Sequence, residues 1–577
     1  MNESTGQAKE PIMVGIDFGT STSEIAFVND EGNVELILNH LGEAITPSVV
    51  YIPEGGAPVV GREAKEMAVI EPENTFLEVK RLMGRDAELS ARGKAYSPVD
   101  AAAMIIGYLA GCARERTGRP VNSAVITVPA YFTDSQRKDV IAAGQAAGLN
   151  VERIINEPTA ASLDYGINHM RDCDYILVYD LGGGTLDVTV LELFEGVVDV
   201  RASCGNNALG GKDFDQAIID HVTGVIKKRD RADITSDARA MMRVKAAAES
   251  CKIALSTEND HTIELPFLFT GKNGEPAGYS ETITRGMFEN MIRDKITSTD
   301  QQIKTALYDA GLGPDEIGLI LLVGGSTRIP MVREFLKEQF GFEPRTAVDP
   351  DLAVVRGAAI QAGVLSGALD ENAIVLTDVC PYSLSTATLT DSFFGFEELI
   401  CDILIKRNTT LPASASKVYA TSRDYQTSVH ISAYQGESED PDENYLLNKF
   451  VLSGIPRAKA RKEKIDIRFE YDLNGILTVS AEILSTGKSG TVTVDTAAMG
   501  KNLDLSKWKD APAAKQYRQI LGKADRLLQV HGSADAGVVE TAANELKKAL
   551  VMGWDREITE RLRHDLQEEI DALEEES

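Results

Sequence analysis

The chain has 577 residues, which is enough for roughly three to five domains or for a few larger ones. Hydrophobic residues make up 43% of it and charged residues 25%, a composition that is typical of folded globular proteins and excludes collagen-like and fully disordered chains. The 59 lysines and arginines stand against 88 aspartates and glutamates, and the resulting net charge of −29 disfavours nucleic acid and anionic membranes as partners, so any nucleotide site must be built locally.

No segment has the features of a membrane span or an export signal. The longest apolar run, residues 101–113, has 13 residues and is short of the roughly 20 that cross a bilayer, so we expect a buried helix there. The start, MNESTGQAKEP, lacks a basic segment followed by an apolar one. The six cysteines form no C-x-x-C pair and are expected to be reduced structural thiols. We therefore expect a cytoplasmic protein.

Between Ile12 and about Gly363, apolar strand-like runs alternate with helical patterns, which is typical of an α/β domain. Two segments there resemble each other: MVGIDFGTSTSEIAFV (13–28) and YILVYDLGGGTLDVTVLEL (175–193). Each starts with an apolar strand, passes through Asp into a Gly-rich turn with Ser or Thr, and ends in a second β-rich strand. This duplicated hairpin predicts two similar lobes that face each other.

The pattern changes after residue 366. An acidic stretch followed by the apolar letters IVLT indicates a linker at residues 367–378. Short alternating stretches separated by turn signals such as Asn474-Gly475 then predict an all-β unit over residues 379–500. Beyond it, in residues 501–577, the apolar spacing predicts three helices, at 512–530, 534–551 and 555–575. The first domain is thus expected to span residues 1–366.

Three glycine-rich turns follow strands of the first domain. Such turns let backbone N–H groups approach phosphates closely. The three turns are Gly19-Thr20-Ser21 after Asp17, Gly182-Gly183-Gly184-Thr185 between Asp180 and Asp187, and a turn with Gly324 and Gly325. The neighbouring carboxylates suit a hydrated Mg²⁺ beside phosphates. Ordinary glycine hairpins are the alternative for each turn alone, but the three together predict a nucleotide clamp.

These turns belong to longer strings that occur in a characteristic order. They are VGIDFGTSTS, VKRLMGR, AVITVPAYFTDSQR, IINEPTAASLDYG, YDLGGGTLDV, LGGKDFD and LLVGGSTRIPMV. They resemble the ATPase domain of the seventy-kilodalton heat-shock chaperone family, the DnaK type. The strings NTTLPASASKVYATSRDYQTSVHISAYQGE and GILTVSAEILSTGKSG resemble that family's peptide-binding domain. The resemblance covers about residues 12–497, and the short connection between Gly84 and Tyr96 resembles the family's bacterial form.

The resemblance implies an α/β actin-like ATPase domain of two lobes, with ATP or ADP, Mg²⁺ and K⁺ between them, then a β-sandwich and a short α-helical segment. Lys80 in VKRLMGR matches the lysine that reaches the γ-phosphate and the attacking water; without the motif it would be interpreted as a solvated surface lysine. Glu157 in NEPTAA matches a carboxylate that holds metal-bound water. The implied catalytic residues are Asp17, Lys80, Glu157, Asp180, Thr185 and Asp187, and the implied metal ligands are Asp17, Glu157, Asp180 and Asp187.

The nucleoside is expected to bind a second group of residues. Glu249, Lys252 and Ser256 are spaced i, i+3 and i+7, which places them on one helix face. By resemblance this face binds adenosine, and the alternative is an exposed charge pair on a helix. The other nucleotide-binding residues matched by motif are Gly211, Gly324, Gly325, Ser326, Arg328 and Asp351.

The β-domain departs from the family pattern. Val429 matches the central pocket residue and Leu389 one arch position, but Ser422 replaces the apolar residue expected at the other. A loop enlarged by residues 390–398 adds Phe393, Phe394 and Phe396, which either contact peptide or form the core of that loop. The 77 residues from Lys501 are too few for the family's full helical lid and tail, so we expect a shortened lid.

We therefore expect an ATP-dependent molecular chaperone, an ATPase whose hydrolysis cycle changes the affinity for apolar segments of unfolded proteins. Arg153 and Asp378 match positions where a J-domain co-chaperone engages, a nucleotide exchange factor is a further expected partner, and the chain is expected to be a monomer. Two alternatives stay open. One is a nucleotide-binding regulator or exchange-factor relative that no longer cycles on peptides, and the other is a small-molecule kinase of the same fold, which the β-domain disfavours.

Overall fold

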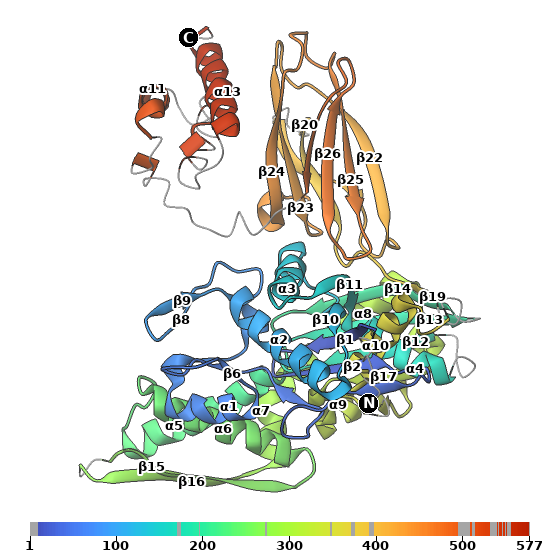
Figure 1. Ribbon diagram of the computed structural model, residues 1–577, viewed down its shortest axis with the longest axis vertical. Coiled ribbons are helices and arrows are strands. Elements are labelled where there is room, and N and C mark those ends of the chain that lie inside the picture. The colour runs from blue at the N-terminus through green and yellow to red at the C-terminus, as the bar shows by residue number, and fades with distance from the viewer. Residues whose placement is uncertain are drawn as a thin grey trace, which may run out of the picture.

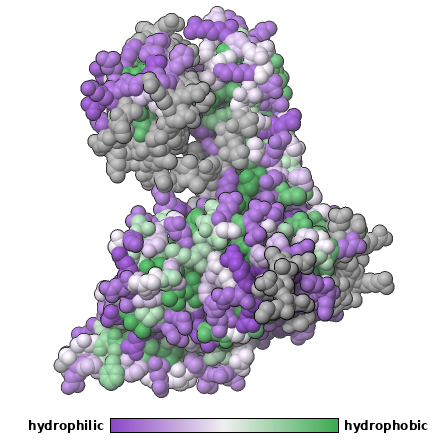
Figure 2. Space-filling model, in the orientation of Figure 1, coloured by the Kyte–Doolittle hydropathy of each residue, from purple (hydrophilic) through white to green (hydrophobic). Residues whose placement is uncertain are grey.

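The computed structural model describes residues 10–169, 175–194, 197–271, 274–346, 349–370, 375–391, 397–493, 508–509, 514–530, 539, 542–544, 546–547, 550 and 556–575. The α/β part of the chain, blue to yellow in Figure 1, lies below an orange β-sandwich, and two red helices lie beside the sandwich. Hydrophilic side chains cover much of the described surface in the view of Figure 2, in keeping with the net charge of −29. Within the described ranges, no helix is long and apolar enough to cross a membrane.

The first lobe is built on a sheet with the strand order β11-β10-β1-β2-β3. The predicted first hairpin is confirmed: β1 (Ile12–Phe18) pairs antiparallel with β2 (Thr22–Val28). β10 (Val121–Val128) runs parallel to β1, and β11 (Asn150–Asn156) runs parallel to β10. β3 (Val34–Leu36) and β4 (Thr46–Pro47) both pair with β2. The carboxyl end of β1 therefore lies in the middle of the sheet.

The second lobe repeats this arrangement in the order β18-β17-β12-β13-β14-β19. Its central hairpin joins β12 (Tyr175–Leu181) to β13 (Leu186–Phe194), with β17 (Leu319–Val323) parallel to β12 and β14 (Val197–Asn206) antiparallel to β13. A short β18 (Arg345–Thr346) completes one edge. In both sheets a hairpin is flanked by a parallel strand on one side and an antiparallel strand on the other, which confirms the predicted duplication.

A small-residue helix joins the two lobes. α10 (Ala353–Ser366) has ten buried residues and packs against β1, β2 and α4 (Glu157–His169). A Cβ atom added at Gly357 would lie 1.7 Å from the carbonyl oxygen of Ala160, so the backbones of α10 and α4 approach as only glycine allows. α10 thus packs on the first hairpin while α4 packs on β12 and β13 of the second, so the helix pair connects the two sheets.

Further helices cover the sheets. The predicted buried helix is confirmed as α2 (Pro98–Thr117), which begins at a capping box of Ser97 and Asp100. The others are α1 (Arg62–Ile70), α3 (Asp134–Ala146), α5 (Gly211–Asp230), α6 (Ala238–Leu255), α7 (Arg285–Thr297), α8 (Asp300–Ala310) and α9 (Pro330–Phe340). Small additional strands are β5 (Val50–Tyr51), β6 (Val59–Val60), β7 (Thr75–Phe76), β8 (Leu89–Ala91), β9 (Lys94–Tyr96) and the long hairpin of β15 (Asp260–Thr270) and β16 (Pro276–Thr284).

The next unit is a sandwich of two antiparallel four-stranded sheets, β21-β20-β23-β24 and β22-β25-β26-β27. Its strands are β20 (Leu384–Asp391), β21 (Glu397–Ile405), β22 (Ala413–Ala420), β23 (Ser428–Gln435), β24 (Tyr445–Ser453), β25 (Lys464–Tyr471), β26 (Leu477–Ile483) and β27 (Lys488–Thr493). Inward-facing residues such as Ile431, Phe469 and Val479 form one shared core. The predicted turn at Asn474-Gly475 is confirmed between β25 and β26. Phe393, Phe394 and Phe396 lie outside the described residues.

Part of the predicted linker is an edge strand of the second lobe. β19 (Val375–Thr377) pairs in parallel with β14, and Thr377 Oγ1 donates a hydrogen bond to Asp199 Oδ1. Ile374 lies outside the described residues. The chain thus leaves the α/β part along its sheet and enters the sandwich directly.

The C-terminal residues form a small helical unit. α11 (Ala514–Val530) and α13 (Arg556–Glu575) confirm the first and third predicted helices, and residues described within 539–550 are helical where the second was predicted. Trp508, Tyr517, Leu546 and Leu566 belong to one buried cluster that joins these segments. The helices therefore pack on one another as a reduced bundle.

Candidate functional site

The first phosphate-type turn is held rigidly at the end of β1. Asp17 is the penultimate residue of this strand, and Thr127 Oγ1 of β10 donates a hydrogen bond of 2.7 Å to Asp17 Oδ1. The N–H of Gly19 donates to Ser23 Oγ at 3.2 Å, and Ser48 Oγ donates to the carbonyl of Gly19 at 2.8 Å. These contacts fix the turn, so the Thr20 and Ser21 backbone is preorganised.

The second turn is fixed by its own hairpin and by the start of α5. Asp180 and Asp187 are direct partners across β12 and β13, and the N–H of Gly182 donates to the Thr185 carbonyl at 3.0 Å. From the other side, the N–H groups of Gly211 and Lys212 donate to the carbonyls of Gly182 and Gly183 at 2.9 and 2.8 Å. The predicted residue Gly211 therefore positions this turn as the first residue of a helix.

The two turns lie directly opposite each other. A Cβ atom added at Gly183 would be 2.4 Å from Ser21 Oγ, and one added at Gly184 would be 3.0 Å from Thr20 Oγ1. A side chain at either position would displace the facing Ser21 or Thr20 side chain, so glycine suits this close approach between the lobes. The structure thus brings together both turns. From the sequence they could be associated only because their residue patterns are similar.

Lys80 and Glu157 meet beside these turns. Lys80 lies in the short 3-10 helix Val79–Leu82 and forms an ion pair with Glu157 Oε1 at the start of α4. Both side chains are almost fully buried, and the Lys80 ammonium also lies 5.9 and 5.7 Å from the ring centres of Phe18 and Phe132. A cavity of about 340 Å³ is lined by Lys80 together with Thr20 and Thr185. The positively charged Lys80 ammonium group is therefore placed beside the two glycine turns.

The acidic residues of the site are held in a dry environment. Burial, and then the charge of Glu157, raises the pKa of Asp17 to about 6 and that of Asp187 to about 7. Burial and the charges of Glu157, Asp187 and Asp17 raise the pKa of Asp180 well above its ordinary value. Among the described residues, Asp180 Oδ2 and Asp187 Oδ2 have no hydrogen-bond partner. Such buried, unpaired carboxylate oxygens fit a bound cation.

The protein groups alone do not form a complete metal site. No three His, Cys, Asp or Glu side chains within the described ranges are close enough to hold a metal ion by themselves. Mg²⁺ commonly keeps several waters and is held by one or two carboxylates together with substrate phosphates. The arrangement of Asp17, Asp180 and Asp187 therefore fits a cation that arrives with a phosphate ligand, whereas Glu157 is already paired with Lys80.

The predicted nucleoside residues line a cavity of about 640 Å³ between α6 and the third glycine turn. Those that line it are Glu249, Lys252, Ser256, Gly325, Ser326, Arg328 and Asp351. Ser326 Oγ donates to the Gly182 carbonyl at 2.9 Å, which ties this cavity to the second turn. Arg328 Nη2 lies 2.6 Å from Asp351 Oδ2, so its planar guanidinium is held at the cavity edge.

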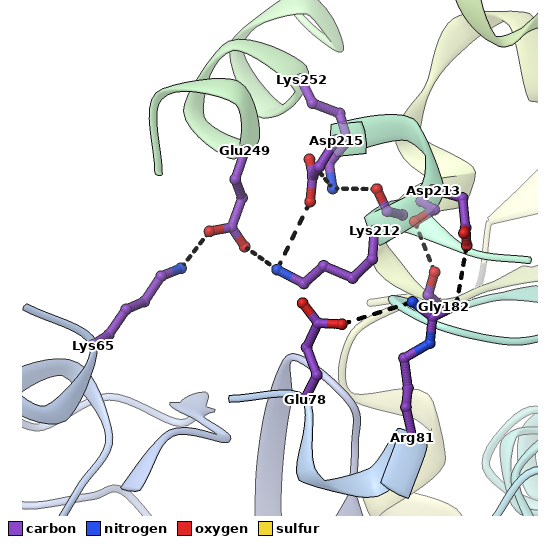
Figure 3. Close-up of polar contacts among 11 residues, drawn as sticks. Lys65, Glu78, Arg81, Gly182, Lys212, Asp213, Asp215, Glu249 and Lys252 are labelled. Carbon is purple, nitrogen blue, oxygen red and sulfur yellow. Dashed lines mark hydrogen bonds and ion pairs between the residues drawn. The ribbon is translucent and has the colours of Figure 1, made fainter. Parts of the chain in front are cut away.

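A charged network beside this cavity links the two lobes, and sequence reasoning missed most of it. In Figure 3, Glu249 lies between Lys65 of α1, at 2.7 Å, and Lys212 of α5, at 3.6 Å. Lys252 lies 2.8 Å from Asp215, and its Nζ donates to the Gly211 carbonyl at 3.0 Å. The string LGGKDFD contains two of these residues, but nothing in it indicates that they pair with α6 and, through Glu249, with α1.

A second bridge crosses the cleft nearer the turns. Arg81, next to Lys80, lies 3.4 Å from Asp213 Oδ2 of the second lobe and 3.6 Å from Glu78 Oε2. Both bridges are visible in Figure 3 as separate contacts from the first lobe to α5 and α6. The lobes are therefore joined by ion pairs on the open side of the site as well as by α10 and α4 at its base.

Comparison with known proteins identifies the family to which this chain belongs. The family model described as Hsp70 protein matches residues 13–577. The chain belongs to the Hsp70 family. It is 43% identical over 488 residues to the Chaperone protein DnaK of Thermotoga petrophila, covering 84% of this chain and 80% of that protein, and the DnaK proteins of Thermotoga maritima and Thermotoga neapolitana match to the same extent. The chain is thus a DnaK-type, ATP-hydrolysing chaperone, and the small-molecule kinase interpretation is set aside.

Two of the three residues that the family resemblance places at the peptide pocket lie on the sheet β21-β20-β23-β24. Leu389 on β20 is 43% exposed, and Val429 on β23 is half-buried against the sandwich core. Ser422 is exposed in the turn before β23, where its N–H donates to Gln426 Oε1 at 3.0 Å. Leu399, directly opposite Leu389, is 48% exposed. This sheet therefore presents apolar side chains to solvent while one predicted arch position is polar.

Proposed function

We propose that ATP or ADP with Mg²⁺ and K⁺ binds between the two turns of this Hsp70 chain, in a two-lobed, actin-like ATPase domain, and that hydrolysis there controls peptide binding by the sandwich. The observation that carries the proposal is the direct opposition of two glycine turns, the second of which lies between the buried Asp180 and Asp187, each with an unpaired carboxylate oxygen. When bound, Mg²⁺ supplies positive charge to the phosphoryl oxygens. Asp17, Asp180 and Asp187 would hold the cations, directly or through water.

The role proposed for Lys80 follows from its position. Buried charge acts strongly on a transferring phosphoryl group because water does not screen it. Lys80 would orient the attacking water and stabilise charge that develops on the γ-phosphate, while Glu157 fixes the ammonium group by its ion pair. Thr185 lines the same cavity and would donate a hydrogen bond to the phosphate or the water. No covalent intermediate is needed.

The nucleoside would occupy the cavity at α6. Glu249, Lys252 and Ser256 present polar groups from one helix face, and the planar Arg328 guanidinium is held in place by Asp351 at the opposite edge. Arginine in such a position can stack on a flat ring and hydrogen-bond to it. Binding energy is thus spread over many groups, whereas hydrolysis depends on few.

Coupling between the two activities would run through the linker and the contacts that follow it. Asn156 Nδ2 at the end of β11 donates to Asp378 Oδ2 at 2.8 Å, and this asparagine also accepts from Arg137 Nη2 at 2.6 Å. The sandwich turn reaches the same sheet, where the Ile154 N–H donates to Asn474 Oδ1 at 3.0 Å. Allostery requires contacts that differ between two states, and these contacts would form in one nucleotide state and break in the other.

We further propose a J-domain co-chaperone, which would engage near Arg153 and Asp378, a nucleotide exchange factor, and extended apolar segments of unfolded proteins as partners of a monomeric chain. Asp378 is almost fully buried, and Arg153 is close enough to lower its pKa, against the larger rise that burial causes. The five described cysteines are all free and buried, which supports a reducing compartment such as the cytoplasm.

The decisive experiment is the ATP hydrolysis rate of the full chain with and without an extended apolar peptide. We expect a slow basal rate that requires Mg²⁺, falls when K⁺ is replaced by Na⁺, and rises several-fold with peptide. A regulator that no longer cycles on peptides would bind ATP but show no response to peptide. Such a result would overturn the proposed coupling.

A further inference from the structure

Glu24 is a buried carboxylate at the site that no motif singles out. It lies on β2, directly opposite Asp17 of β1 in the antiparallel register. Cross-strand partners project from the same face of a sheet, so the two carboxylates share one face, and the first glycine turn connects their strands. Only 2% of Glu24 is exposed. The Glu24 carboxyl is therefore enclosed in the protein beside Asp17, below the first glycine turn.

One oxygen of this side chain lacks a partner. The Thr22 side chain forms a hydrogen bond with Glu24, but Oε1 has no hydrogen-bond partner within the described part of the chain. Burial raises the pKa of Glu24 well above its ordinary value, and the charges of Asp17 and Asp351 add to the rise. The buried Glu24 carboxyl thus lies beside the Asp17 carboxyl on the same sheet and within range of the charge of Asp351, and both of these aspartates are partly exposed.

The positive charge nearby is already engaged. Lys80 acts on Glu24 from a distance but forms its ion pair with Glu157. Asp17 receives a hydrogen bond from Thr127, and a hydroxyl group does not neutralise a carboxylate. A buried carboxylate without a counter-charge is unfavourable, and a bound cation would remove this penalty. Hard cations take carboxylate oxygens, carbonyl oxygens and water as ligands.

We propose that Glu24 is a cation ligand, which together with Asp17 forms a two-carboxylate site for a hard cation. This inference rests on the proposed nucleotide site, because phosphate oxygens or water must complete the coordination that protein groups alone do not provide. The site would hold its cation under the first glycine turn. Glu24 thereby adds a ligand beyond the aspartates that the motifs indicate.

The test measures cation binding rather than turnover. Full-length wild type, Glu24→Gln, Glu24→Asp and the control Glu35→Gln, an exposed glutamate on β3, are titrated with Mn²⁺ by electron paramagnetic resonance and with Tl⁺ by thallium NMR, with and without ADP. We expect Glu24→Gln to bind one of these cations at least tenfold more weakly than wild type, Glu24→Asp to fall between them, and Glu35→Gln to match wild type. Equal binding of both cations by wild type and Glu24→Gln overturns the proposal.

Thermal unfolding provides the second readout and checks that the variants fold. In cation-free buffer Glu24→Gln should unfold at a higher temperature than wild type, since it removes a buried carboxyl group whose ionisation is unfavourable in the folded state. Added MgCl₂ or KCl should raise the unfolding temperature of wild type more than that of Glu24→Gln. An identical cation-dependent shift in both proteins also overturns the proposal. Binding of a fluorescent ADP separates the proposed nucleotide site from the proposed role of Glu24. If wild type does not bind the fluorescent ADP, the proposed nucleotide site is wrong whatever the role of Glu24. If every variant binds it while cation binding is unchanged, only the proposed role of Glu24 is wrong.

Discussion

Lys80 and Glu157 form a buried ion pair that joins the 3-10 helix after β7 to the first residue of α4. Their side chains are 3% and 11% exposed. A pair removed from water in this way is held in one geometry, and breaking it leaves the other charge without a counter-ion. The ammonium group is therefore positioned before any nucleotide binds.

The first prediction concerns this lysine. Lys80→Ala should lower the rate of ATP hydrolysis about 100-fold or more, the effect usual for removing one preorganised charge-stabilising group. ATP affinity should change little, because binding is distributed over two turns and the α6 cavity. Single-turnover hydrolysis and equilibrium binding measure the two quantities separately. Lys304→Ala, at an exposed lysine of α8, is the control, and a wild-type rate in Lys80→Ala would contradict the assignment.

The duplicated hairpins, α2 and the turn at Asn474-Gly475 were predictable because each has a local signal: a repeated Asp-Gly pattern, a long apolar run with a cap, and an Asn-Gly pair. The strand β19 was not predicted. Its residues Val375–Thr377 look like an apolar linker, and only the free edge of β14 in the folded sheet makes them a strand. Edge pairing depends on the tertiary structure, so local sequence does not determine it.

The second prediction is a pH dependence caused by Asp187. Burial and Glu157 raise its pKa to about 7, from the ordinary value of 3.8. The native state therefore keeps a proton that the unfolded state releases, and this contribution to stability is lost as pH rises from about 4 to about 7. In nucleotide-free protein, Asp187→Asn should unfold at a higher temperature than wild type, by several degrees at pH 8 and much less at pH 5. Calorimetry at three pH values tests this.

The exposed Asp86→Asn serves as the control for that series and should show no pH-dependent difference. Mg²⁺ with ADP should reverse the order at pH 8, because a bound cation then compensates the Asp187 charge. A difference between Asp187→Asn and wild type that stays constant across the pH range would show that Asp187 is not the group responsible.

The third prediction concerns the hydrogen bond between Asn156 and Asp378. Asp378→Asn places two amides against each other and removes the charge that Arg153 faces. Peptide stimulation of ATP hydrolysis should fall several-fold while ADP affinity stays unchanged. Limited proteolysis of the linker should become less dependent on nucleotide than in wild type. Asp442→Asn, at an exposed loop of the sandwich, is the matched control, and linker cleavage that never depends on nucleotide would contradict the coupling.

The sequence predicts those site residues that lie in a family motif. It does not predict those whose role depends on a contact with a residue that is distant in the sequence. Asp17, Lys80 and Asp180 lie in strings that the family resemblance identifies. Lys65 and Arg81 appear in sequence as ordinary surface cations, and their contacts with Glu249 and Asp213 arise only because the two lobes close on each other. Glu24 follows its turn by a few residues and looks like any polar position in a strand. Its burial and its pairing with Asp17 become visible only in the folded sheet.

The last prediction concerns release of peptide by the sandwich. α11 and α13 pack through a core of their own, and Ser428 Oγ of β23 donates to Glu569 Oε1 of α13 at 2.8 Å, next to Val429. At 1.5 Å rise per residue, the 20 residues of α13 span roughly 30 Å, so a bundle of this size covers part of the sandwich and not all of it.

Partial cover slows the escape of a bound peptide less than full closure does, and affinity differences of this kind appear mainly in the dissociation rate. We therefore expect fast release of a fluorescent peptide even with ADP, in stopped-flow experiments with residues 503–577 present or deleted. A dissociation half-life of many minutes with ADP that is lost on deletion, and shortened by Glu569→Gln, would show instead that the bundle is a competent lid.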